Sequence, residues 1–379
     1  MGKYYRRGGV KRIMMIAGEP SGDLHASNLI RELKKLSPDI EIFGTGGDKM
    51  KAAGAKIIFH LRELAVTGLF DVIKSLPKLK KVQSELLSKI REEKTDLIIL
   101  IDYPDFNLRF AKKAHKLGVP IIYYISPQVW AWRKGRIKLI KKYIKKIFVI
   151  FKFEEELYKK AGVPVEFVGH PLLDIVKQRT ENREQRTDKI IALLPGSRKG
   201  LVKMHLPIML EAAKLISDKL PDVRFLISKS PSVDKKIYAV GAYSHTPLHF
   251  TIAEGSAYDI INASDAVLVI SGTATLETAI LEKPMVIIYK LPILEYLIAK
   301  PLLVLKHIGL VNIVAGREVV PELIQFKATP KIIAKNLIDI LTDKQKYGEI
   351  KNNLAAVKNS LYPSGASQRA AASILKFLD

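Results

Sequence analysis

Short apolar runs rich in β-branched residues alternate along this chain with stretches whose apolar residues recur at helical spacing. In the first half, the apolar runs predict strands at Ile13–Ala17, Ile40–Gly44, Leu97–Ile101, Ile121–Ile125, Ile147–Ile150 and Glu166–Val168. The stretches between them predict helices at Asp23–Leu36, Leu79–Glu93, Leu108–Leu117, Lys134–Lys142 and Glu154–Ala161. Strands that are apolar throughout, each followed by a helix, are typical of a parallel sheet covered on both faces.

A polar segment at 177–189, which contains no apolar residue, interrupts this pattern and is interpreted as a linker or an exposed helix. The pattern then resumes with strands predicted at Ile190–Leu194, Arg224–Ser228, Leu248–Thr251, Ala266–Ile270 and Met285–Tyr289, and the tail from Pro330 is helical. We therefore expect an α/β fold with two Rossmann-like domains, each on a parallel sheet, and a cleft between them. The expected parts are a basic arm (1–11), an N-terminal domain (12–176), the linker (177–189), a C-terminal domain (190–340) and C-terminal helices (341–379), whose packing back onto the N-terminal domain is left open.

The net charge of the chain indicates which classes of partner it attracts. Lysine and arginine exceed aspartate and glutamate by 24, which predicts attraction to nucleic acid, phospholipid headgroups or a phosphorylated substrate, although lysine-rich surfaces also accompany thermophily. The chain has no cysteine, which excludes disulfides and thiolate chemistry. The longest apolar stretch, Leu291–Leu305, is interrupted by Glu295 and Lys300, so we expect a soluble or peripheral protein.

Loops that carry chemistry follow the predicted strands of the first half. Small residues after the first strand let a backbone approach a ligand, or form a tight turn with an aspartate cap; they and their polar neighbours are Gly18, Glu19, Ser21, Gly22 and Asp23. Asp102 and Asp105 follow Leu97–Ile101, where either is a candidate general base or a helix cap. His170 is a candidate for substrate contact or proton transfer, with a structural role as the alternative.

Two loops of the second half are candidate phosphate-binding sites. Gly196, Ser197 and Arg198 follow one strand, where backbone N–H groups and a guanidinium fork suit a diphosphate. A small hydroxyl-bearing loop follows another and opens a helix; its candidate residues are Ser271, Gly272, Thr273, Ala274 and Glu277. In the first half, neither the 17–23 loop nor the glycine-rich 44–48 loop has the spaced glycines of a dinucleotide site, so we expect no nicotinamide cofactor. No cluster of histidines and aspartates has metal-ligand spacing.

The chain's two tryptophans, Trp130 and Trp132, stand with Arg133 in one stretch after the apolar residues 119–122. Bulky rings with N–H donors at the carboxyl end of a strand suit the wall of a site, and covering a helix is the alternative. Taken together, the loops resemble those of lipid-A-disaccharide synthases, inverting glycosyltransferases of the GT-B architecture. The matching segments are 17–23 (AGEPSGD), 101–107 (IDYPDFN), 126–133 (SPQVWAWR), 168–171 (VGHP), 194–198 (LPGSR), 271–277 (SGTATLE), 312–316 (NIVAG) and 320–323 (VPEL).

This resemblance implies a reaction. UDP-2,3-diacylglucosamine donates its sugar to 2,3-diacylglucosamine 1-phosphate (lipid X), giving a β-1,6-linked disaccharide 1-phosphate of lipid A biosynthesis and UDP. It implies that the second domain binds the donor, through Arg198, the 271–277 loop and Asn312, and that Asp102 is the leading base. It implies that the first domain binds the acceptor. Trp130 and Trp132 are candidates to flank the acyl sugar and Arg133 to meet its phosphate, but the resemblance does not assign these residues a role. We expect no cofactor and no metal requirement. The alternative within this class is another UDP-sugar enzyme, an epimerase or a cell-wall glycosyltransferase.

Acylated substrates require a membrane-facing surface. Leu69, Phe70, Val72 and Ile73 lie beside a run of lysines, which predicts shallow insertion into an anionic membrane, with a core-packed helix as the alternative. We expect a cytoplasmic protein, peripheral on the inner face of the inner membrane. The basic residues are scattered and no nucleic-acid recognition motif is present, so we expect no nucleic-acid partner. Whether the chain forms a homo-oligomer is left open.

Overall fold

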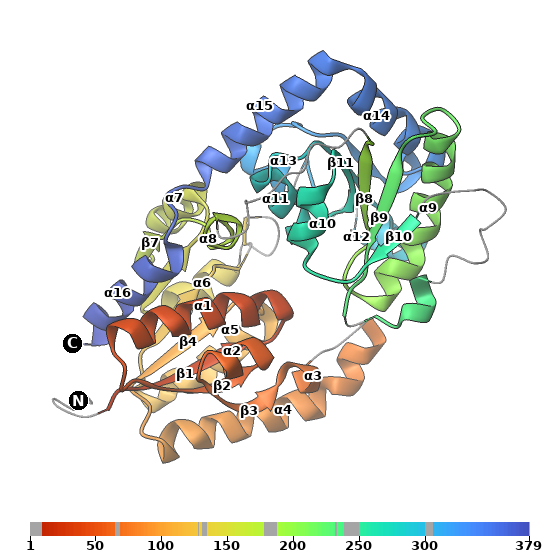
Figure 1. Ribbon diagram of the computed structural model, residues 1–379. Helices are drawn as coiled ribbons and strands as arrows, with labels where there is room; N and C mark the ends of the chain where they lie inside the picture. The colour runs from red at the N-terminus through yellow and green to blue at the C-terminus, as the bar shows by residue number, and fades with distance from the viewer. Residues whose placement is uncertain are drawn as a thin grey trace. The chain divides into compact units, whose positions relative to one another are not determined.

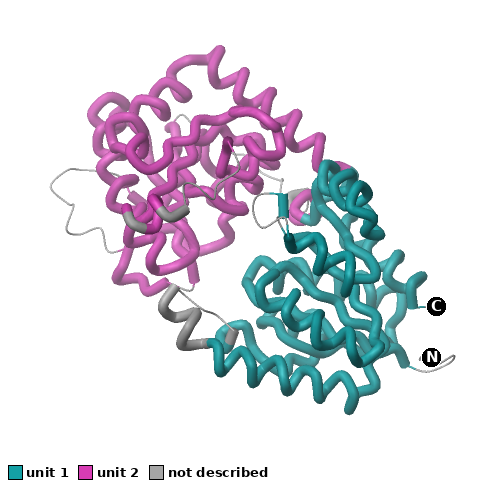
Figure 2. Tube along the Cα trace, turned by 180° about the vertical axis from the view of Figure 1, so that it is seen from behind, with its two compact units in different colours: residues 1–171, 363–379 teal, residues 172–362 magenta. Residues whose placement is uncertain are grey.

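The computed structural model describes residues 10–64, 69–127, 129–130, 135–177, 188–231, 233–238, 250–299 and 306–378. Within them the chain divides into two compact units (Figure 2). Unit 1 comprises residues 1–171 and 363–379, and unit 2 comprises residues 172–362. The predicted linker 177–189 and the predicted N-terminal arm 1–11 fall almost entirely outside the described residues.

Unit 1 is built on a parallel sheet with the strand order β3-β2-β1-β4-β5-β6-β7 in the described chain (Figure 1). Its strands are β1 (Arg12–Ala17), β2 (Glu41–Gly46), β3 (Lys56–His60), β4 (Leu97–Ile101), β5 (Ile121–Tyr124), β6 (Lys146–Val149) and β7 (Val165–Phe167). Its helices are α1 (Pro20–Leu36), α2 (Asp48–Ala52), α3 (Leu61–Leu64), α4 (Leu69–Glu92), α5 (Pro104–Ala114), η1 (His115–Leu117), α6 (Arg136–Tyr143), α7 (Lys152–Lys160) and α16 (Ala366–Leu378). This confirms the parallel α/β prediction.

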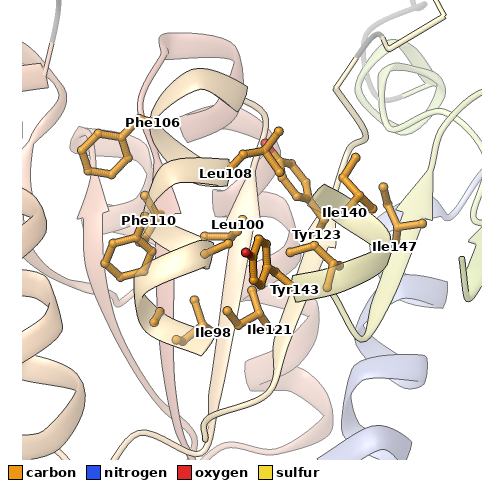
Figure 3. Packing of buried hydrophobic residues seen from close by; sticks show 14 of the residues in the cluster. Ile98, Leu100, Phe106, Leu108, Phe110, Ile121, Tyr123, Ile140, Tyr143 and Ile147 are labelled. Atoms are coloured by element: carbon orange, nitrogen blue, oxygen red, sulfur yellow. The ribbon is translucent and has the colours of Figure 1, made fainter. Parts of the chain in front are cut away.

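The core of unit 1 explains why the apolar runs form strands. Residues at alternate positions of β1 point to opposite faces, and Met14 and Ile16 join the cluster that α4, α5 and α6 cover. Figure 3 shows part of this cluster, in which rings from α5 and α6 lie over side chains of β4 and β5. Helices α1 and α16 pack against each other. A strand covered on both faces needs apolar side chains at every position.

The last residues of the chain are fixed to unit 1 by Arg369. Its guanidinium donates to the carbonyl oxygen of Val168, at 3.0 Å from Nε, and to that of Ser364, at 2.6 Å from Nη1. Gly169, between β7 and His170, has a φ of +78°, and a Cβ at this position would lie 2.1 Å from the carbonyl oxygen of Pro363. Only glycine suits both the backbone conformation and this close approach.

Unit 2 is built on a second parallel sheet, with the order β10-β9-β8-β11-β12-β13 in the described chain. Its strands are β8 (Ile190–Leu194), β9 (Arg224–Ser228), β10 (Phe250–Ala253), β11 (Ala266–Ile270), β12 (Met285–Tyr289) and β13 (Glu322–Ile324). Its helices are α8 (Leu172–Lys177), α9 (Lys199–Ser217), η2 (Lys235–Tyr238), α10 (Ala257–Ala263), α11 (Thr273–Ile280), α12 (Ile293–Ala299), α13 (Leu310–Ala315), η5 (Gln325–Lys327), α14 (Pro330–Thr342) and α15 (Lys344–Ser360). Both sheets therefore place all their carboxyl-end loops at one edge.

Some boundaries differ from the sequence prediction. Helix α1 begins at Pro20 rather than at Asp23, because proline suits the first helical turn and Glu19 already has the extended backbone of an N-cap. Strands β3 and β13 were not predicted. Both are edge strands, and the residues of β3 are half-buried or exposed, so neither has the continuous apolar run of a central strand.

Candidate active site

In unit 1 the strand order reverses between β1 and β4, and this is where ligands bind in open parallel sheets. Ala17 pairs with Ile101 at the ends of these strands. The residues that follow, Gly18 with Glu19 and Asp102, are therefore neighbours across the reversal point. The sequence-predicted loop and the sequence-predicted base are brought together at this position.

The backbone at Asp102 is strained and firmly held. Asp102 and Tyr103 both have positive φ values, 44° and 47°, which non-glycine residues rarely adopt. The carbonyl oxygen of Asp102 accepts hydrogen bonds from the Tyr123 hydroxyl at 2.5 Å and from Asn107 Nδ2 at 2.7 Å. Such strain persists only where surrounding contacts over-determine it, and it concentrates at functional sites.

The environment of Asp102 suits a proton acceptor. Burial, with a smaller contribution from the nearby carboxylate of Glu19, raises the pKa of its carboxyl from 3.8 to about 6. A base is most effective when its pKa lies near the working pH, because it is then mostly ionised yet still basic. Asp102 at this edge of the sheet can therefore take a proton from a hydroxyl group near neutral pH.

Gly18 lets the ring of Tyr103 approach the β1 loop. A Cβ at Gly18 would lie 2.2 Å from Cδ1 of Tyr103, which no side chain can tolerate. Gly22 is different, because a Cβ there would meet Ala17 and Ile101 at ordinary contact distances of 3.4 and 3.8 Å. Gly18 is thus required by packing beside the candidate base.

Asp105 has a different environment from Asp102. It lies in the first turn of α5, is exposed, and forms an ion pair with Arg136 of α6, with Oδ1 and Nη2 2.6 Å apart. The guanidinium occupies one of its carboxylate oxygens. Of the two aspartates proposed from the sequence, Asp102 is the one that follows directly on the end of β4, and its pKa is raised.

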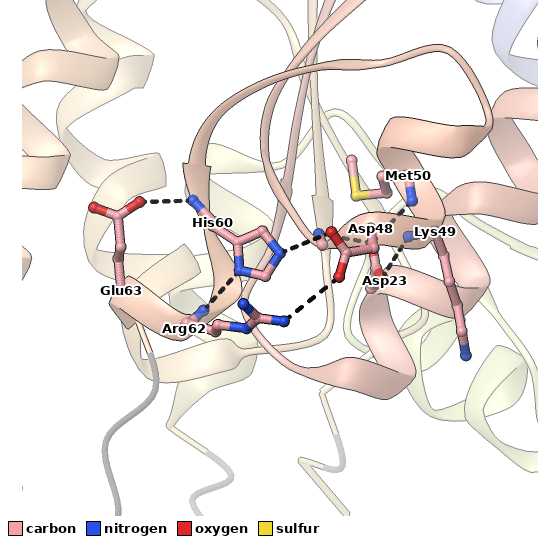
Figure 4. Close-up of polar contacts among 8 residues, drawn as sticks. Asp23, Asp48, Lys49, Met50, His60, Arg62 and Glu63 are labelled. Carbon is pink, nitrogen blue, oxygen red and sulfur yellow. Dashed lines mark hydrogen bonds and ion pairs between the residues drawn. The ribbon is translucent and has the colours of Figure 1, made fainter. Parts of the chain in front are cut away.

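Asp23 has a structural role that its motif does not reveal. It is buried inside α1, and its carboxylate accepts from the backbone N–H groups of Gly47 at 2.7 Å, Met50 at 3.0 Å and Lys49 at 3.2 Å (Figure 4). It therefore ties the start of α2 to α1 instead of capping its own helix. Ser21, in the first turn of α1, is half-buried.

His170 lies after β7 and is almost fully buried, with its ring centroid 5.3 Å from that of Phe151. Burial, with a smaller contribution from His25, lowers the pKa of His170 well below 6.5. His25, buried on α1, has its pKa lowered to about 4 by burial and by Lys49. Both imidazoles are neutral at pH 7, so neither can act there as a cationic acid.

Trp130 is held by Glu154, a residue that the sequence did not single out. The indole Nε1 donates to Glu154 Oε1 at 3.0 Å, and the ring packs edge-on against Phe153 at 5.3 Å. Glu154 also accepts from the N–H of Phe151 at 3.3 Å and is almost fully buried. Burial raises the pKa of its carboxyl to about 8, against the lowering effect of the Trp130 hydrogen bond. Trp132 and Arg133 lie outside the described residues.

In unit 2 the strand order reverses between β8 and β11. Val269 pairs with Leu194 near the ends of these strands, so the Gly196–Arg198 loop and the Ser271–Gly272 loop are neighbours. Gly196 has a φ of +110°, and a Cβ there would lie 2.6 Å from Ile270 Cδ1. The sheet thus brings together the two phosphate-binding loops predicted from the sequence.

Arg198 and α11 supply the positive groups of this position. Arg198 is exposed at the start of α9 and lies close enough to Tyr289 to lower the pKa of its hydroxyl, although burial raises that pKa overall. The exposed Gly272 and Thr273 begin α11, where N–H groups have no partner within the helix. Ser271 itself donates to the carbonyl oxygen of Ile308 at 2.8 Å. Ala274 and Glu277 follow in α11, both partly exposed.

Asn312 is a correction to the donor site implied by the resemblance. It is fully buried, and its Nδ2 donates to the carbonyl oxygen of Val320 at 2.9 Å and to Glu322 Oε1 at 2.8 Å. Its Oδ1 accepts from the N–H groups of Val319 and Val320. Both N–H donors and both oxygen lone pairs of the Asn312 side chain are therefore used within the protein. Asn312 therefore joins α13 to the chain before β13 and has no capacity left for a ligand.

The membrane-facing residues predicted at 69–73 belong to the start of α4, but their side chains lie outside the described part of the chain. Across the described ranges, no group of three or more histidines or carboxylates is placed to hold a metal ion. In the same ranges, no helix combines the length and apolar character needed to cross a bilayer.

Solved structures with this architecture define the class. The chain aligns with a glycosyltransferase of kitacinnamycin at a TM-score of 0.67 and 14% identity, over 98% of this chain and all of the other. It aligns with the UDP-GlcNAc 2-epimerase from Neisseria meningitidis, bound to UDP-GlcNAc, at a TM-score of 0.65 and 15% identity, over 96% and 100%. These likenesses show the fold alone, which is the GT-B fold of glycosyltransferases and related epimerases.

Sequence relatives identify the family. The family model described as lipid-A-disaccharide synthetase matches residues 13–375. Lipid-A-disaccharide synthases from Syntrophus aciditrophicus and Geobacter metallireducens are 43% and 42% identical, over 97% of this chain and 98% and 97% of theirs. Lipid-A-disaccharide synthase 1 from Legionella pneumophila is 42% identical over 94% of each chain. The chain belongs to this family, and it is a glycosyltransferase.

Proposed function

We propose that the chain transfers the acylated glucosamine of UDP-2,3-diacylglucosamine to the 6-hydroxyl of lipid X, with inversion and release of UDP. The observation that carries the proposal is Asp102, a partly buried carboxyl with a raised pKa at the reversal point of the unit 1 sheet. The family supplies the class of substrates, a UDP-sugar and a lipid acceptor.

Inversion requires one in-line attack by the acceptor oxygen on the anomeric carbon. The new bond forms as the bond to UDP breaks, and the hydroxyl proton must leave. Asp102 takes that proton, because a carboxylate with a pKa of about 6 is ionised at pH 7 and still basic enough to act. The hydrogen bonds from Tyr123 and Asn107 to its carbonyl oxygen hold the backbone while the side chain acts.

The leaving diphosphate gains negative charge as the bond breaks. In unit 2, the guanidinium of Arg198 and the N–H groups at the start of α11 stabilise this charge. The backbone N–H groups are held in place by the start of α11, so they need no rearrangement during the reaction. The absence of a metal and of a cofactor stays a prediction. We further propose that the chain works at the inner face of the cytoplasmic membrane, because its acylated substrates partition into a membrane.

The reaction is tested with purified chain, UDP-2,3-diacylglucosamine and lipid X. We expect UDP release that depends on the acceptor and a product with a β-configured 1,6 bond, measured by mass spectrometry and by the anomeric coupling in NMR. An α-configured product contradicts inversion. Acceptor-independent conversion of the UDP-sugar to an epimer contradicts the transferase and supports the epimerase alternative.

Arg198→Met is expected to lower kcat/KM for the UDP-sugar by about 10–100-fold, because a charge-assisted hydrogen bond to phosphate contributes about 1.5–3 kcal/mol. Lys199→Met is the matched control, since it removes an exposed cation at the next position without the guanidinium fork. Steady-state kinetics and UDP-binding calorimetry measure both variants. Equal losses in the two would indicate general attraction to positive charge and contradict a specific diphosphate contact.

A further inference from the structure

The most exposed large apolar side chains of the described residues lie together in unit 2. Phe326 is 72% exposed, Ile293 is 63% exposed and Leu297 is 59% exposed. Single exposed apolar residues are ordinary on protein surfaces. These three side chains are more exposed than every other described large apolar residue, and they come from adjoining elements. Together they form a patch that needs an explanation.

Local geometry holds these side chains as one surface. Ile293, Tyr296 and Leu297 share one face of α12, because residues three and four apart are neighbours on a helix. The Tyr296 ring meets the Phe326 ring edge-on, with centroids 6.1 Å apart. The Gln325 amide also bonds both backbone groups of Leu291, at 3.0 Å to the N–H and 2.8 Å to the carbonyl oxygen. Helix α12 and η5 are thereby joined, and we call Ile293, Tyr296, Leu297 and Phe326 the α12–η5 patch.

The patch lies at the functional edge of the unit 2 sheet. Helix α12 follows β12, and η5 follows β13 directly. In the sheet, β12 lies beside β11, whose carboxyl end carries the candidate phosphate loop. All strands are parallel, so the patch and that loop are on the same edge.

Charge indicates what covers the patch. Lys327 is exposed next to Phe326, and Lys331 is exposed in the first turn of α14. The chain as a whole carries a formal charge of +24. Apolar side chains bordered by lysines suit the boundary between acyl chains and anionic headgroups. The only acidic residue of α12, Glu295, occupies a position off the helix face that carries Ile293 and Leu297.

We propose that the α12–η5 patch docks unit 2 onto an anionic lipid bilayer by shallow insertion of its apolar side chains. The proposal extends the proposed function, because acylated substrates are held in a membrane and their donor-binding unit must reach it. It is separate from the predicted contact at 69–73, which belongs to unit 1. A second copy of the chain and the acyl chains of a single bound substrate are the occupants that the test must exclude.

The test compares the triple variant Ile293→Glu/Leu297→Glu/Phe326→Glu with a control that gains the same number of acidic residues elsewhere. The control is Leu36→Glu/Leu139→Glu/Tyr362→Glu, whose native side chains are 51%, 39% and 48% exposed. Both are mixed, without substrate, with vesicles of phosphatidylcholine alone or with phosphatidylglycerol, and sedimented. Circular dichroism and thermal unfolding report whether each variant folds, and single substitutions replace a triple that does not.

We expect wild type to bind the phosphatidylglycerol vesicles more tightly than the neutral ones. The patch variant is expected to partition onto the vesicles at least about tenfold more weakly, beyond any loss in the control. Full burial of one large apolar side chain strengthens partitioning by about tenfold or more. Its turnover of short-acyl substrates in free solution is expected to be unchanged.

Equal partitioning of the patch variant and the control would overturn the proposal. A patch variant that changes its oligomeric state but still binds vesicles would also overturn the proposal, because the patch would then be a contact between copies of the chain. A raised KM for long-acyl donor in solution, again with vesicle binding retained, would identify a substrate subsite and also overturn it. Wild type that binds vesicles but turns over no acylated UDP-sugar would contradict the proposed function and leave the docking surface standing.

Discussion

Asp102→Asn is expected to lower kcat by about 10²–10⁴-fold with little change in KM, because general-base catalysis contributes about that much and an amide cannot accept the hydroxyl proton. The substitution keeps the size of the side chain, and the bonds from Tyr123 and Asn107 go to the backbone carbonyl, so the loop is retained. Steady-state kinetics with both substrates measures the loss, and circular dichroism confirms the fold.

Asp105→Asn is the matched control. The exposed Asp105 is already paired with the buried Arg136 and is not assigned the proton transfer, so Asp105→Asn is expected to lower turnover by no more than about tenfold, less than the loss of a general base. A loss in Asp105→Asn as large as that in Asp102→Asn would contradict the assignment. Near wild-type turnover in Asp102→Asn would overturn it outright.

The pH profile of the wild type gives a second test of the same base. The base must be ionised, so kcat/KM is expected to rise with pH through about 6 and then level off. Glu19→Gln removes the negative charge that helps to raise the pKa of Asp102. The acidic limb of the profile is therefore expected to move to lower pH. The move is expected to be smaller than the whole rise in the pKa of Asp102, because burial is the larger cause of that rise. A limb that stays in place would mean that another group controls it.

The central strands could be predicted from the sequence because their chemistry is local. Each of β1, β4 and β11 contains a run of five buried apolar residues, since helices cover both faces of the sheet. Strand β13 has only three residues and lies at the edge of its sheet, so its sequence carries no such requirement. The length of an apolar run thus reports burial on both faces. The edge strands β3 and β13 were missed, whereas β7 and β10, which also lie at sheet edges, were predicted within a few residues.

Asp102 could be predicted for a related reason. A parallel sheet places loop residues at one edge, so a carboxylate after a buried strand is a candidate wherever the strand lies. The resemblance favours Asp102 over Asp105, but the physical ground for that preference could not be predicted, because it depends on Arg136, 31 residues from Asp105, and on burial. The motif identifies the loop, and only the packing separates the two carboxylates.

Asp23 and Asn312 show where prediction from a motif assigns the wrong role. Both stand in family strings, and both use their polar atoms on groups of the protein itself. Asp23 bonds backbone N–H groups 24 to 27 positions away, and Asn312 bonds backbone groups and the carboxylate of Glu322. A polar residue in a motif can hold the loops of a site in place without touching the ligand. No periodicity or spacing in the chain distinguishes these two uses.

Glu154 was missed because nothing local marks it. It lies in the first turn of α7, where glutamate is common, and its burial depends on Trp130, 24 residues earlier. The tryptophan stretch was identified as the feature, and the residue that holds it was not. The Glu154 carboxyl beside Trp130, with its pKa of about 8, makes the stability of the fold sensitive to pH.

Wild type is expected to lose stability relative to Glu154→Gln as the pH rises from about 4.5 to about 8. The native carboxyl holds its proton up to a pKa of about 8, whereas in the unfolded chain it ionises near 4.5. The native state therefore binds more protons in this window, and the free energy of unfolding falls as the pH rises. By pH 7 the ionisation of Glu154 in the unfolded chain has lowered the free energy of unfolding by about 3 kcal/mol, at 1.36 kcal/mol for each pH unit above 4.5.

The difference between the two proteins isolates this group. Asp102 lowers stability over part of the same range, whereas the buried His25 raises it as the pH rises from about 4 to 6.5, and these effects are common to both chains. Urea unfolding at several pH values gives the difference directly. In a Trp132→Phe background, the emission of Trp130 is expected to change near pH 8 in the parent and to stay constant in Glu154→Gln. Parallel stability curves for the two proteins would mean that Glu154 is already ionised in the native state, with its Trp130 hydrogen bond strong enough to offset burial.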